Sequence, residues 1–470
     1  MTSLFFTIVD GWEWASIGLT LLITVYLLVD LIAAILWPPP PRRYPKQAQF
    51  PMVSIVIPVY NEPVEIVRAS VESWKAVRYP KFEIILADDS TEPIELNDPS
   101  VRVLRRPTRE GFKGGALRNA VGHLDPASEW MVVFDADFLV DPDVLVRFSE
   151  HYGPQVGGVQ GFISMGNTPS PNYLSRFSEA FHHVANALLA GRYRLRGFVG
   201  VQGTVQSYRV EAIRSIGGLA PYSTANEDLD TTFRLRKAGW KIVYDPRIAG
   251  RGMAPEEYRV FFTQTTRWTS STIREYRRHF PSFVRSRNVP AREKIDSVFF
   301  FLTWSNSLLV TPTLAFLPWA LTNLHLIPLW LAILITLLPV SLFALPVLIG
   351  IPWRVGLLGW VGYYVLLLPG YFVMFRAALL GLFTEPGFAR TAKTVRGSPA
   401  VGAAPLTPAR ALSTLHQASC TQCGRTLSHR EVLFFAVGGL DLRSLTCGNC
   451  LRRAEWLRGR RAVPGYSGLT

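Results

Sequence analysis

Two apolar regions constrain what this chain can fold into, because both are long enough to lie in lipid. Residues 15–37 are nearly all apolar and can cross a hydrocarbon core of about 30 Å at about 1.5 Å per residue. A second apolar block runs from about residue 297 to residue 383. Polar interruptions divide it into three further predicted spans, at 297–321, 326–350 and 355–380. The sequence therefore predicts a multi-pass membrane protein.

Charged residues around the first span predict its orientation. Arg42, Arg43 and Lys46 follow it, whereas only Asp10 and Glu13 precede it. The positive-inside rule then places the N-terminus outside and the large middle segment in the cytosol. No basic residue precedes the span and no small-residue cleavage site follows it, which favours a retained anchor over a signal peptide. We expect the plasma membrane as the location.

The chain is basic, with 49 Lys+Arg against 35 Asp+Glu and a net charge of +14. Such a charge is compatible with binding to nucleic acid. Here the basic residues lie beside the apolar spans and in the C-terminal tail, where anionic lipid headgroups are the commoner partner. We therefore predict membrane lipids as a partner and no nucleic acid.

Between the apolar regions, short β-branched runs alternate with helical stretches. The runs predict strands at 53–59, 82–87, 101–104 and 130–134. Such alternation is typical of an α/β domain with a mostly parallel sheet. In these sheets, ligands bind in the crevice beyond the carboxyl ends of the strands.

Acidic pairs occur at that edge of the predicted sheet. Asp88 and Asp89 follow the second strand, and Asp135 and Asp137 follow the fourth. Either pair alone is equally well explained as a helix N-cap or a turn. Two pairs at strand ends of one sheet favour a site, and crowded carboxylates favour a hard divalent cation with oxygen ligands.

Six motifs make the interpretation specific. Their order and approximate spacing resemble those of family 2 glycosyltransferases: VSIVIPVYNEP, LADDS, KGGALRNAV, VVFDADF, ANEDLDTTFRLRKAGW and QTTRW. They cover about residues 50–280, and the chain resembles the processive subgroup of cellulose, hyaluronan, chitin and mannan synthases. One Asp-x-Asp would be a weak signal, but ordered motifs are hard to obtain by chance. The resemblance implies a GT-A (Rossmann-like) cytosolic domain beside transmembrane helices.

The resemblance also implies which residues bind a nucleotide-sugar donor. Asp135 and Asp137 would hold Mg²⁺ or Mn²⁺ on the diphosphate, and Asp88 and Asp89 would contact the base and ribose. Lys113 begins a Lys-Gly-Gly loop, whose small residues let a phosphate-bearing ligand approach the backbone. The alternative for Lys113 is a solvated surface lysine. Between UDP and GDP, the resemblance favours a UDP-linked donor.

An inverting transferase needs a carboxylate to take the proton of the attacking acceptor hydroxyl. Asp228, in Asn226-Glu227-Asp228, matches the family's base, although the family usually has Thr where Asn226 lies. The alternative is an ordinary acid in the first turn of a helix. Glu227 is also predicted at the acceptor, together with Gly203 and Thr204, which match a segment near the acceptor in relatives.

Gln264, Arg267 and Trp268 match a QxxRW motif, and their spacing places them on one face of a helix. Gln264 and Arg267 are predicted to bind the donor, where Arg267 suits diphosphate oxygens, and Trp268 offers a ring face to an acceptor sugar. The alternative is an interfacial helix anchored at headgroups, and both interpretations can hold together. The family often has small residues and Gly after the Trp, whereas this chain has Thr-Ser-Ser, so the resemblance stops at the entrance of an acceptor channel.

All the cysteines of the chain lie in the tail, in a CxxC…CxxC pattern. Four thiolates at this spacing predict a zinc ribbon, with Zn²⁺ held by Cys420, Cys423, Cys447 and Cys450. Disulfides are the alternative, which a reducing cytosol disfavours.

Three spans after a cytosolic domain would place the C-terminal tail outside the cell. The basic residues and thiols of the tail favour the cytosolic side. A split of the last span at Pro369 would return the tail to that side, and we predict a cytosolic tail. A protein partner for the ribbon is one predicted role.

One acid lies inside the first span. A carboxylate facing lipid there costs about 3 kcal/mol, so Asp30 should face other helices. Arg376, in the last apolar stretch, is its predicted partner. Snorkelling of both side chains to headgroups is the alternative.

The predicted organisation has five parts, in this order: anchor 1–48, GT-A domain with interfacial helix 49–290, transmembrane helices 291–384, linker 385–415 and zinc ribbon 416–462. The leading hypothesis is a metal-dependent inverting glycosyltransferase that extends a β-linked polysaccharide. The nearest alternative adds one sugar to a lipid or polyprenyl phosphate. A catalytically inactive receptor for nucleotide sugars is a third, disfavoured because all the expected acids are present.

Overall fold

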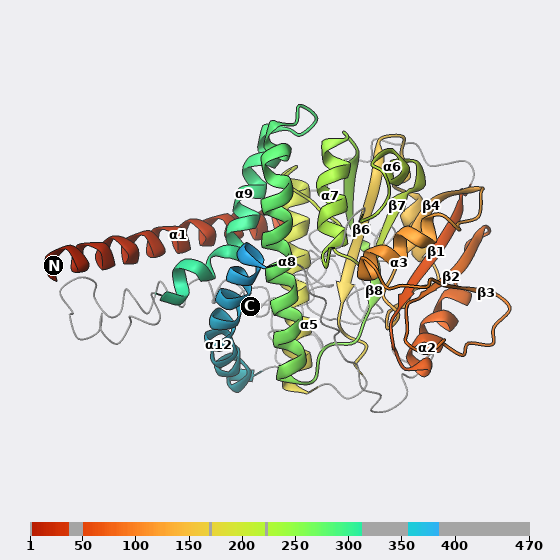
Figure 1. Cartoon of the computed structure of the whole chain (residues 1–470), viewed down its shortest axis with the longest axis horizontal. Coiled ribbons are helices and arrows are strands. Elements are labelled where there is room, and N and C mark those ends of the chain that lie inside the picture. The colour runs from red at the N-terminus through yellow and green to blue at the C-terminus, as the bar shows by residue number, and fades with distance from the viewer. Residues whose placement is uncertain (1, 37–49, 169–171, 221–223, 313–355, 385–470) are drawn as a thin grey trace, which may run out of the picture.

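The computed structural model describes residues 2–36, 50–168, 172–220, 224–312 and 356–384 (Figure 1). The predicted linker and zinc ribbon, and the predicted span 326–350, lie outside these residues. The described strands are β1 (Met52–Val59), β2 (Phe82–Asp88), β3 (Val101–Arg105), β4 (Ser128–Val133), β5 (Leu139–Val140), β6 (Val156–Ser164), β7 (Gln206–Arg209) and β8 (Lys241–Arg251). The described helices are α1 (Thr2–Leu36), α2 (Val64–Lys75), α3 (Phe112–Val121), α4 (Val144–Ser149), α5 (Tyr173–Arg194), α6 (Val210–Ser215), α7 (Glu227–Lys237), α8 (Tyr258–Arg285), α9 (Ala291–Ser305) and α12 (Gly356–Phe383).

The strands form one mixed sheet in the order β3-β2-β1-β4-β7-β6-β8-β5. The four strands predicted from the sequence, β1 to β4, pair with one another in parallel, as expected. Beyond β4 the prediction of a mostly parallel sheet is wrong, because β7 runs antiparallel to both β4 and β6. Gln206 at the start of β7 pairs with Val133 at the end of β4. The segment before β7 is therefore delivered to the carboxyl edge of the parallel strands.

Alternate side chains of the central strands are buried on opposite faces of the sheet. Val53, Ile55 and Ile57 of β1 share one apolar cluster with Trp74 of α2, and Val56 belongs to the cluster on the other face. Helices cover both faces, so β1 has no solvent-facing side, which explains its near-continuous apolar sequence.

Helix α1 projects from the body of the protein, with the N-terminus at its far end (Figure 1). Its segment Trp14–Leu36 is long and apolar enough to cross a membrane, and within the described residues no other helix meets that criterion. Ile23, Leu27 and Leu31 pack against Val184 and Leu188 of α5. Helix α1 thus docks on a helix of the domain that carries the sheet.

Helix α12 lies against α8 and covers the last predicted span. It runs through Pro369 without a break in helical structure, so the predicted split of this span at Pro369 is wrong. Its last turn is bonded to α8: Arg274 Nε donates to the carbonyl of Thr384 at 3.2 Å, and Arg277 donates to the carbonyl of Leu382. Cationic donors at a helix C-terminus satisfy carbonyls that have no partner within the helix.

Asp30 does not pair with Arg376. Its Oδ2 accepts a hydrogen bond from Nε of Arg192 on α5 at 3.1 Å, and both side chains are buried. The helices approach closely, since a Cβ at Gly191 would lie 1.9 Å from the carbonyl oxygen of Asp30. The prediction chose the wrong helix because it considered only apolar spans as neighbours, whereas α5 belongs to the sheet domain.

We expect Asp30→Asn and Arg192→Gln each to lower the melting temperature of the protein in detergent. Each change leaves one buried charge without its partner, which costs about 3–5 kcal/mol. The double variant should lose less than the sum of the single losses. Thermal unfolding of the four proteins measures this coupling, with Arg376→Gln as the uncoupled control. Strict additivity between Asp30 and Arg192 would contradict the pairing.

Candidate active site

The predicted site residues come from six places in the fold. Asp88 and Asp89 lie at the end of β2, and Asp135 and Asp137 follow β4. Lys113 lies in the first turn of α3, Gly203 and Thr204 precede β7, and Glu227 and Asp228 begin α7. Gln264, Arg267 and Trp268 lie on α8, which confirms that the QxxRW motif is helical.

Lys113 joins three of these elements. Its Nζ donates to Asp135 Oδ1 at 2.6 Å and to the carbonyl of Gly203 at 2.7 Å, and it lies 3.6 Å from Glu227 Oε1. Burial opposes protonation, but the carboxylates of Asp135 and Glu227 outweigh it and raise the pKa of Lys113. Lys113 is therefore a charged residue within the cluster, and the alternative of a solvated surface lysine is wrong.

The two glycines after Lys113 are required by packing. A Cβ at Gly114 would lie 2.8 Å from the Cβ of Glu227, and a Cβ at Gly115 would lie 2.0 Å from the carbonyl oxygen of Glu110. These are closer than real Cβ contacts allow. The absence of side chains here lets α3 approach the start of α7, which brings Lys113 to the acids.

Asp228 lies beside Gly203. Its Oδ1 accepts a hydrogen bond from the Leu229 amide at 3.0 Å, and its Oδ2 lies 3.3 Å from where a Cβ on Gly203 would be. Gly203 has a φ of 84°, which favours glycine. Burial, and then the charge of Glu227, raise the pKa of Asp228 to about 7, although Lys113 opposes the shift. The side chain is half-buried, so it keeps access to solvent.

Arg267 on α8 belongs to the same charge cluster. Burial lowers the pKa of Arg267, and the negative charges of Glu227, Asp135 and Asp228 oppose that shift. Gln264 is buried one helical turn earlier. The ring of Trp268 meets His182 of α5 edge-on, with ring centroids 5.9 Å apart. The motif thus brings a guanidinium to the acids and places an aromatic ring between α5 and α8.

Asp88 and Asp89 are engaged by arginines that the sequence analysis missed. Asp88 is buried and accepts hydrogen bonds from the amides of Ser90 and Ile94, and from Arg105 at 2.6 Å. Asp89 makes a bidentate pair with Arg106, at 2.7 and 2.6 Å. The only signal in the sequence was the adjacent Arg-Arg after a predicted strand.

The Asp-x-Asp motif offers oxygen ligands. The Asp135 amide donates to Thr204 Oγ1 at 3.0 Å, and Asp137 is buried and accepts from the Met253 amide at 2.8 Å. Two carboxylates after one strand suit Mg²⁺ or Mn²⁺, which prefer hard oxygen donors and leave further positions to phosphate and water oxygens. The carboxylate oxygens of this motif therefore fit the expected cation, and Lys113 provides a positive charge beside them.

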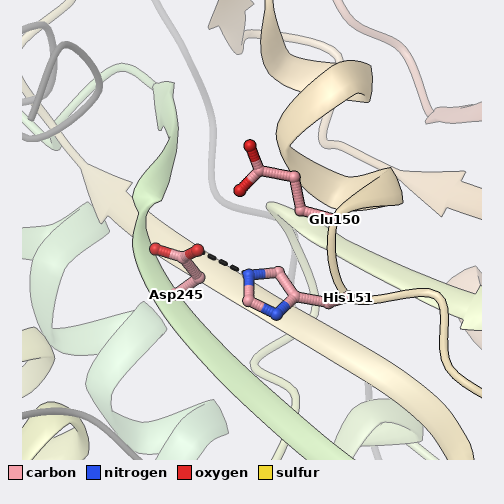
Figure 2. A group of neighbouring side chains, drawn as sticks. All are labelled: Glu150, His151 and Asp245. Carbon is pink, nitrogen blue, oxygen red and sulfur yellow. Dashed lines mark hydrogen bonds and ion pairs between the residues drawn. The ribbon is translucent and has the colours of Figure 1, made fainter. Parts of the chain in front are cut away.

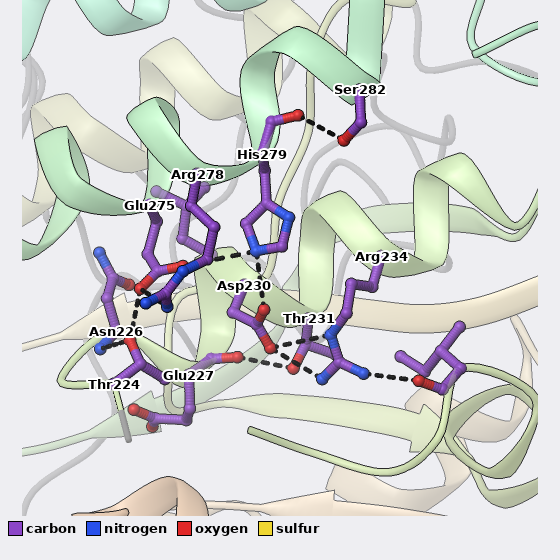
Figure 3. Close-up of polar contacts among 12 residues, drawn as sticks. Thr224, Asn226, Glu227, Asp230, Thr231, Arg234, Glu275, Arg278, His279 and Ser282 are labelled. Carbon is purple, nitrogen blue, oxygen red and sulfur yellow. Dashed lines mark hydrogen bonds and ion pairs between the residues drawn. The ribbon is translucent and has the colours of Figure 1, made fainter. Parts of the chain in front are cut away.

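Two other groups of side chains in the described part of the chain lie close enough to hold a metal ion. In the first, His151 Nε2 lies 2.5 Å from Asp245 Oδ2, with Glu150 nearby (Figure 2). Arg247 pairs with Asp245 and lies 3.0 Å from Glu150 Oε2. A guanidinium already neutralises these carboxylates, so an ion-pair network explains the group. The second group joins Asp230, Glu275 and His279 (Figure 3).

Comparison with known proteins shows what this part of the chain is similar to. Residues 51–271 match the family described as "Glycosyltransferase like family 2". Similar proteins include "Probable glucomannan 4-beta-mannosyltransferase 15" of Arabidopsis thaliana, 29% identical over 300 residues that cover 57% of this chain and 55% of that protein. "Glucomannan 4-beta-mannosyltransferase 7" of the same plant is 29% identical over 268 residues, 53% of this chain and 47% of that protein. The chain spans about half the length of the curated relatives it matches.

A solved structure shares the fold. The mannosyltransferase PcManGT from Pyrobaculum calidifontis, in complex with GDP-Man and Mn²⁺, superposes with a TM-score of 0.58 at 18% identity, over 80% of this chain and 99% of that chain. This likeness confirms the predicted GT-A-like fold, with the mixed sheet described above.

Proposed function

We propose that this chain, whose residues 51–271 form a family 2 glycosyltransferase domain, transfers sugar from a nucleotide donor to a growing β-linked polysaccharide, with inversion. The observation that carries the proposal is one cluster at the carboxyl edge of the sheet. There Lys113 bonds Asp135 and Gly203, and Asp228 lies beside Gly203. A base and a cation next to an Asp-x-Asp motif are the groups that sugar transfer needs.

Asp228 supplies the base in this proposal. The acceptor hydroxyl oxygen bonds to the anomeric carbon, the bond from that carbon to the diphosphate breaks, and the hydroxyl proton passes to the Asp228 carboxylate. The nucleoside diphosphate leaves with the bonding electrons. A carboxyl with its pKa near 7 suits this task, because a large share of it is ionised at neutral pH and the ionised form is basic enough to hold the proton.

Lys113 and Arg267 would balance the charge on the leaving diphosphate. Lys113 already bonds Asp135, and Arg267 feels the charges of Glu227, Asp135 and Asp228. A divalent cation held by Asp135 and Asp137 would supply further neutralisation of the diphosphate when bound. Asp89, paired with Arg106 at the end of β2, is proposed at the nucleotide, and Asp88 supports that loop.

The acceptor side is proposed at Trp268, Gly203, Thr204 and Glu227, with a glycan chain as acceptor. The names of the curated relatives, glucomannan 4-beta-mannosyltransferases, support a β-linked polysaccharide and make mannose a sugar to test. Addition of one sugar to a lipid or polyprenyl phosphate is the second candidate, which the apolar helix α1 also favours. We place the protein in the plasma membrane, multi-pass, with the catalytic domain cytosolic.

A donor screen tests the proposed function. The purified protein is incubated with Mn²⁺ and a panel of UDP-sugars and GDP-mannose, and nucleoside diphosphate release and product size are measured. We expect release with one donor and long products. Products extended by one sugar would support the second candidate. The absence of nucleoside diphosphate release with every donor would overturn the proposal that the chain is a glycosyltransferase. Release from UDP-sugars alone would support the donor class that the sequence resemblance favours.

The tail carries a separate proposal. We propose that Cys420, Cys423, Cys447 and Cys450 hold one structural Zn²⁺, on the strength of their spacing alone. Metal analysis of the full chain should give one zinc per protein, and the variant Cys420→Ser/Cys447→Ser should lose it. Transfer activity serves as the control that the rest of the chain remains folded. A protein without zinc, or with disulfides in the tail, would contradict this proposal.

A further inference from the structure

A buried polar cluster joins helix α7, which begins with the proposed base, to helix α8, which carries the QxxRW motif (Figure 3). His279 Nε2 on α8 lies 2.8 Å from Oδ1 of Asp230 on α7 and 3.4 Å from Oε2 of Glu275, one turn earlier on α8. All three residues are buried. The ring of Phe233 stacks on the imidazole, with centroids 5.5 Å apart. The cluster is thus fixed from both helices.

Basic side chains surround the two carboxylates. Arg234 on α7 bonds Asp230 Oδ2 through two nitrogens, and Arg278 on α8 lies 3.3 Å from Glu275. Lys237 Nζ lies 3.4 Å from His279 Nδ1 and donates to Ser282 Oγ at 2.9 Å. Burial opposes protonation of the imidazole, but its bonds to Asp230 and Glu275 outweigh it and raise the pKa of His279. Charge is balanced by these groups, so a metal ion is not needed here.

The chain immediately before the proposed base is bonded to the same helix. Thr224 Oγ1 donates to Glu275 Oε1 at 2.6 Å, and Asn226 Nδ2 donates to Thr272 Oγ1 at 3.2 Å. The amide of Asn226 in turn donates to Thr224 Oγ1. The residues just before α7 and the first turn of α7 are therefore both bonded to α8, on either side of Asp228.

Helical spacing connects this cluster to the motif. Steps of three and four positions along α8 place these residues on one face: Gln264, Trp268, Thr272, Glu275 and His279. The same face of one helix thus bears the motif at one end and the contacts to α7 at the other. A helix is stiff over this length, so a shift at His279 changes the position of α7 relative to the motif.

We propose that Glu275 and His279 are positioning residues, which hold Asp228 at its place relative to Arg267 by fixing the start of α7 on α8. The proposal deepens the proposed function and rests on Asp228 as the base. Misplacement of a catalytic group by about 1 Å can cost about 100-fold in rate. The loss should therefore appear in kcat more than in donor affinity.

His279→Phe and His279→Gln test the proposal. Phe keeps the packing on Phe233 and removes the bonds to Asp230 and Glu275, whereas the Gln amide retains a donor toward Asp230. We expect His279→Phe to lower kcat at least tenfold, to leave the donor KM within about twofold and to move the pH midpoint of kcat, because the surroundings of Asp228 change. His279→Gln should recover most of kcat. Glu275→Gln, a milder change, should move the midpoint in the same way if His279→Phe fails to fold.

His151→Gln provides the matched control, since His151 makes an equivalent buried bond to a carboxylate, Asp245, away from the site. It should change the melting temperature and leave kcat and its pH midpoint as in the wild type. A His279→Phe enzyme with wild-type kcat and pH midpoint, whatever its melting temperature, would overturn the positioning role alone. Absence of transfer by the wild type with every donor would overturn the proposed function and this inference together.

Discussion

Replacement of Asp228 by Asn should abolish sugar transfer and leave donor binding intact. The Asn amide has nearly the same shape, can keep the hydrogen bond from the Leu229 amide and has no basic site for the acceptor proton. We expect kcat to fall by about 10²–10⁴-fold, the range that general-base catalysis contributes. Nucleotide release measures kcat, and calorimetry with the donor measures affinity.

Glu211→Gln is the matched control for Asp228→Asn. Glu211 is an exposed acid in the first turn of α6, so it represents a helix-terminal carboxylate without a catalytic role. This variant should keep wild-type turnover. Near-normal turnover by Asp228→Asn would show that Asp228, like Glu211, is a helix-terminal carboxylate without a catalytic role.

The raised pKa of Asp228 also predicts how activity depends on pH. Only the ionised carboxylate accepts the proton, so kcat should rise as pH increases through about 7, the pKa of Asp228. At low pH the carboxyl is protonated and the enzyme is inactive. The residual activity of Asp228→Asn should lack this step. A wild-type profile that falls as pH rises through neutrality would contradict the assignment of Asp228 as a base.

The part of the fold that the sequence predicts is the part that depends on local patterns. Residues 53–59 and 82–87 are short apolar runs, the second followed at once by two acids, and the structure has parallel strands at Met52–Val59 and Phe82–Asp88. The antiparallel strand β7 has only four residues, Gln206–Arg209, and its sequence has no apolar run that would mark it. Its direction is set by the tertiary position of the chain before it, which no local pattern encodes.

The candidate site divides in the same way. Motif spacing indicated Lys113, Asp135 and Asp228, and the structure brings them together around Gly203. The spacing did not indicate Arg106, which lies in the loop after β3, or His279, which follows the motif by three turns of helix. Partners of buried acids are chosen by helices that pack together from distant parts of the chain, and the pairing of Asp30 with Arg192 is a further example.

The second large effect is expected at Asp137. Asp137→Ala should lose the part of donor affinity that depends on Mn²⁺, because a hard cation requires carboxylate oxygens. Loss of groups that merely support a metal ligand costs about 10–100-fold in metal affinity, so loss of the ligand itself should cost at least as much. Calorimetry with the donor, in Mn²⁺ and in a chelator, measures the difference.

Asp137 also accepts a hydrogen bond from the Met253 amide, so Asp137→Ala leaves a buried amide without its acceptor and should lower the melting temperature as well. Asp137→Asn separates the two effects, since its amide oxygen still accepts that bond and only the charge is removed. Asp143→Ala, at an exposed carboxylate that is paired with Arg78 just before α4, is the control for a general loss of charge. If Asp137 is a metal ligand, Asp137→Asn keeps the wild-type melting temperature and loses Mn²⁺-dependent affinity, whereas Asp143→Ala keeps both. Equal donor affinity of Asp137→Asn and wild type in Mn²⁺ would show that the carboxylate serves the fold alone.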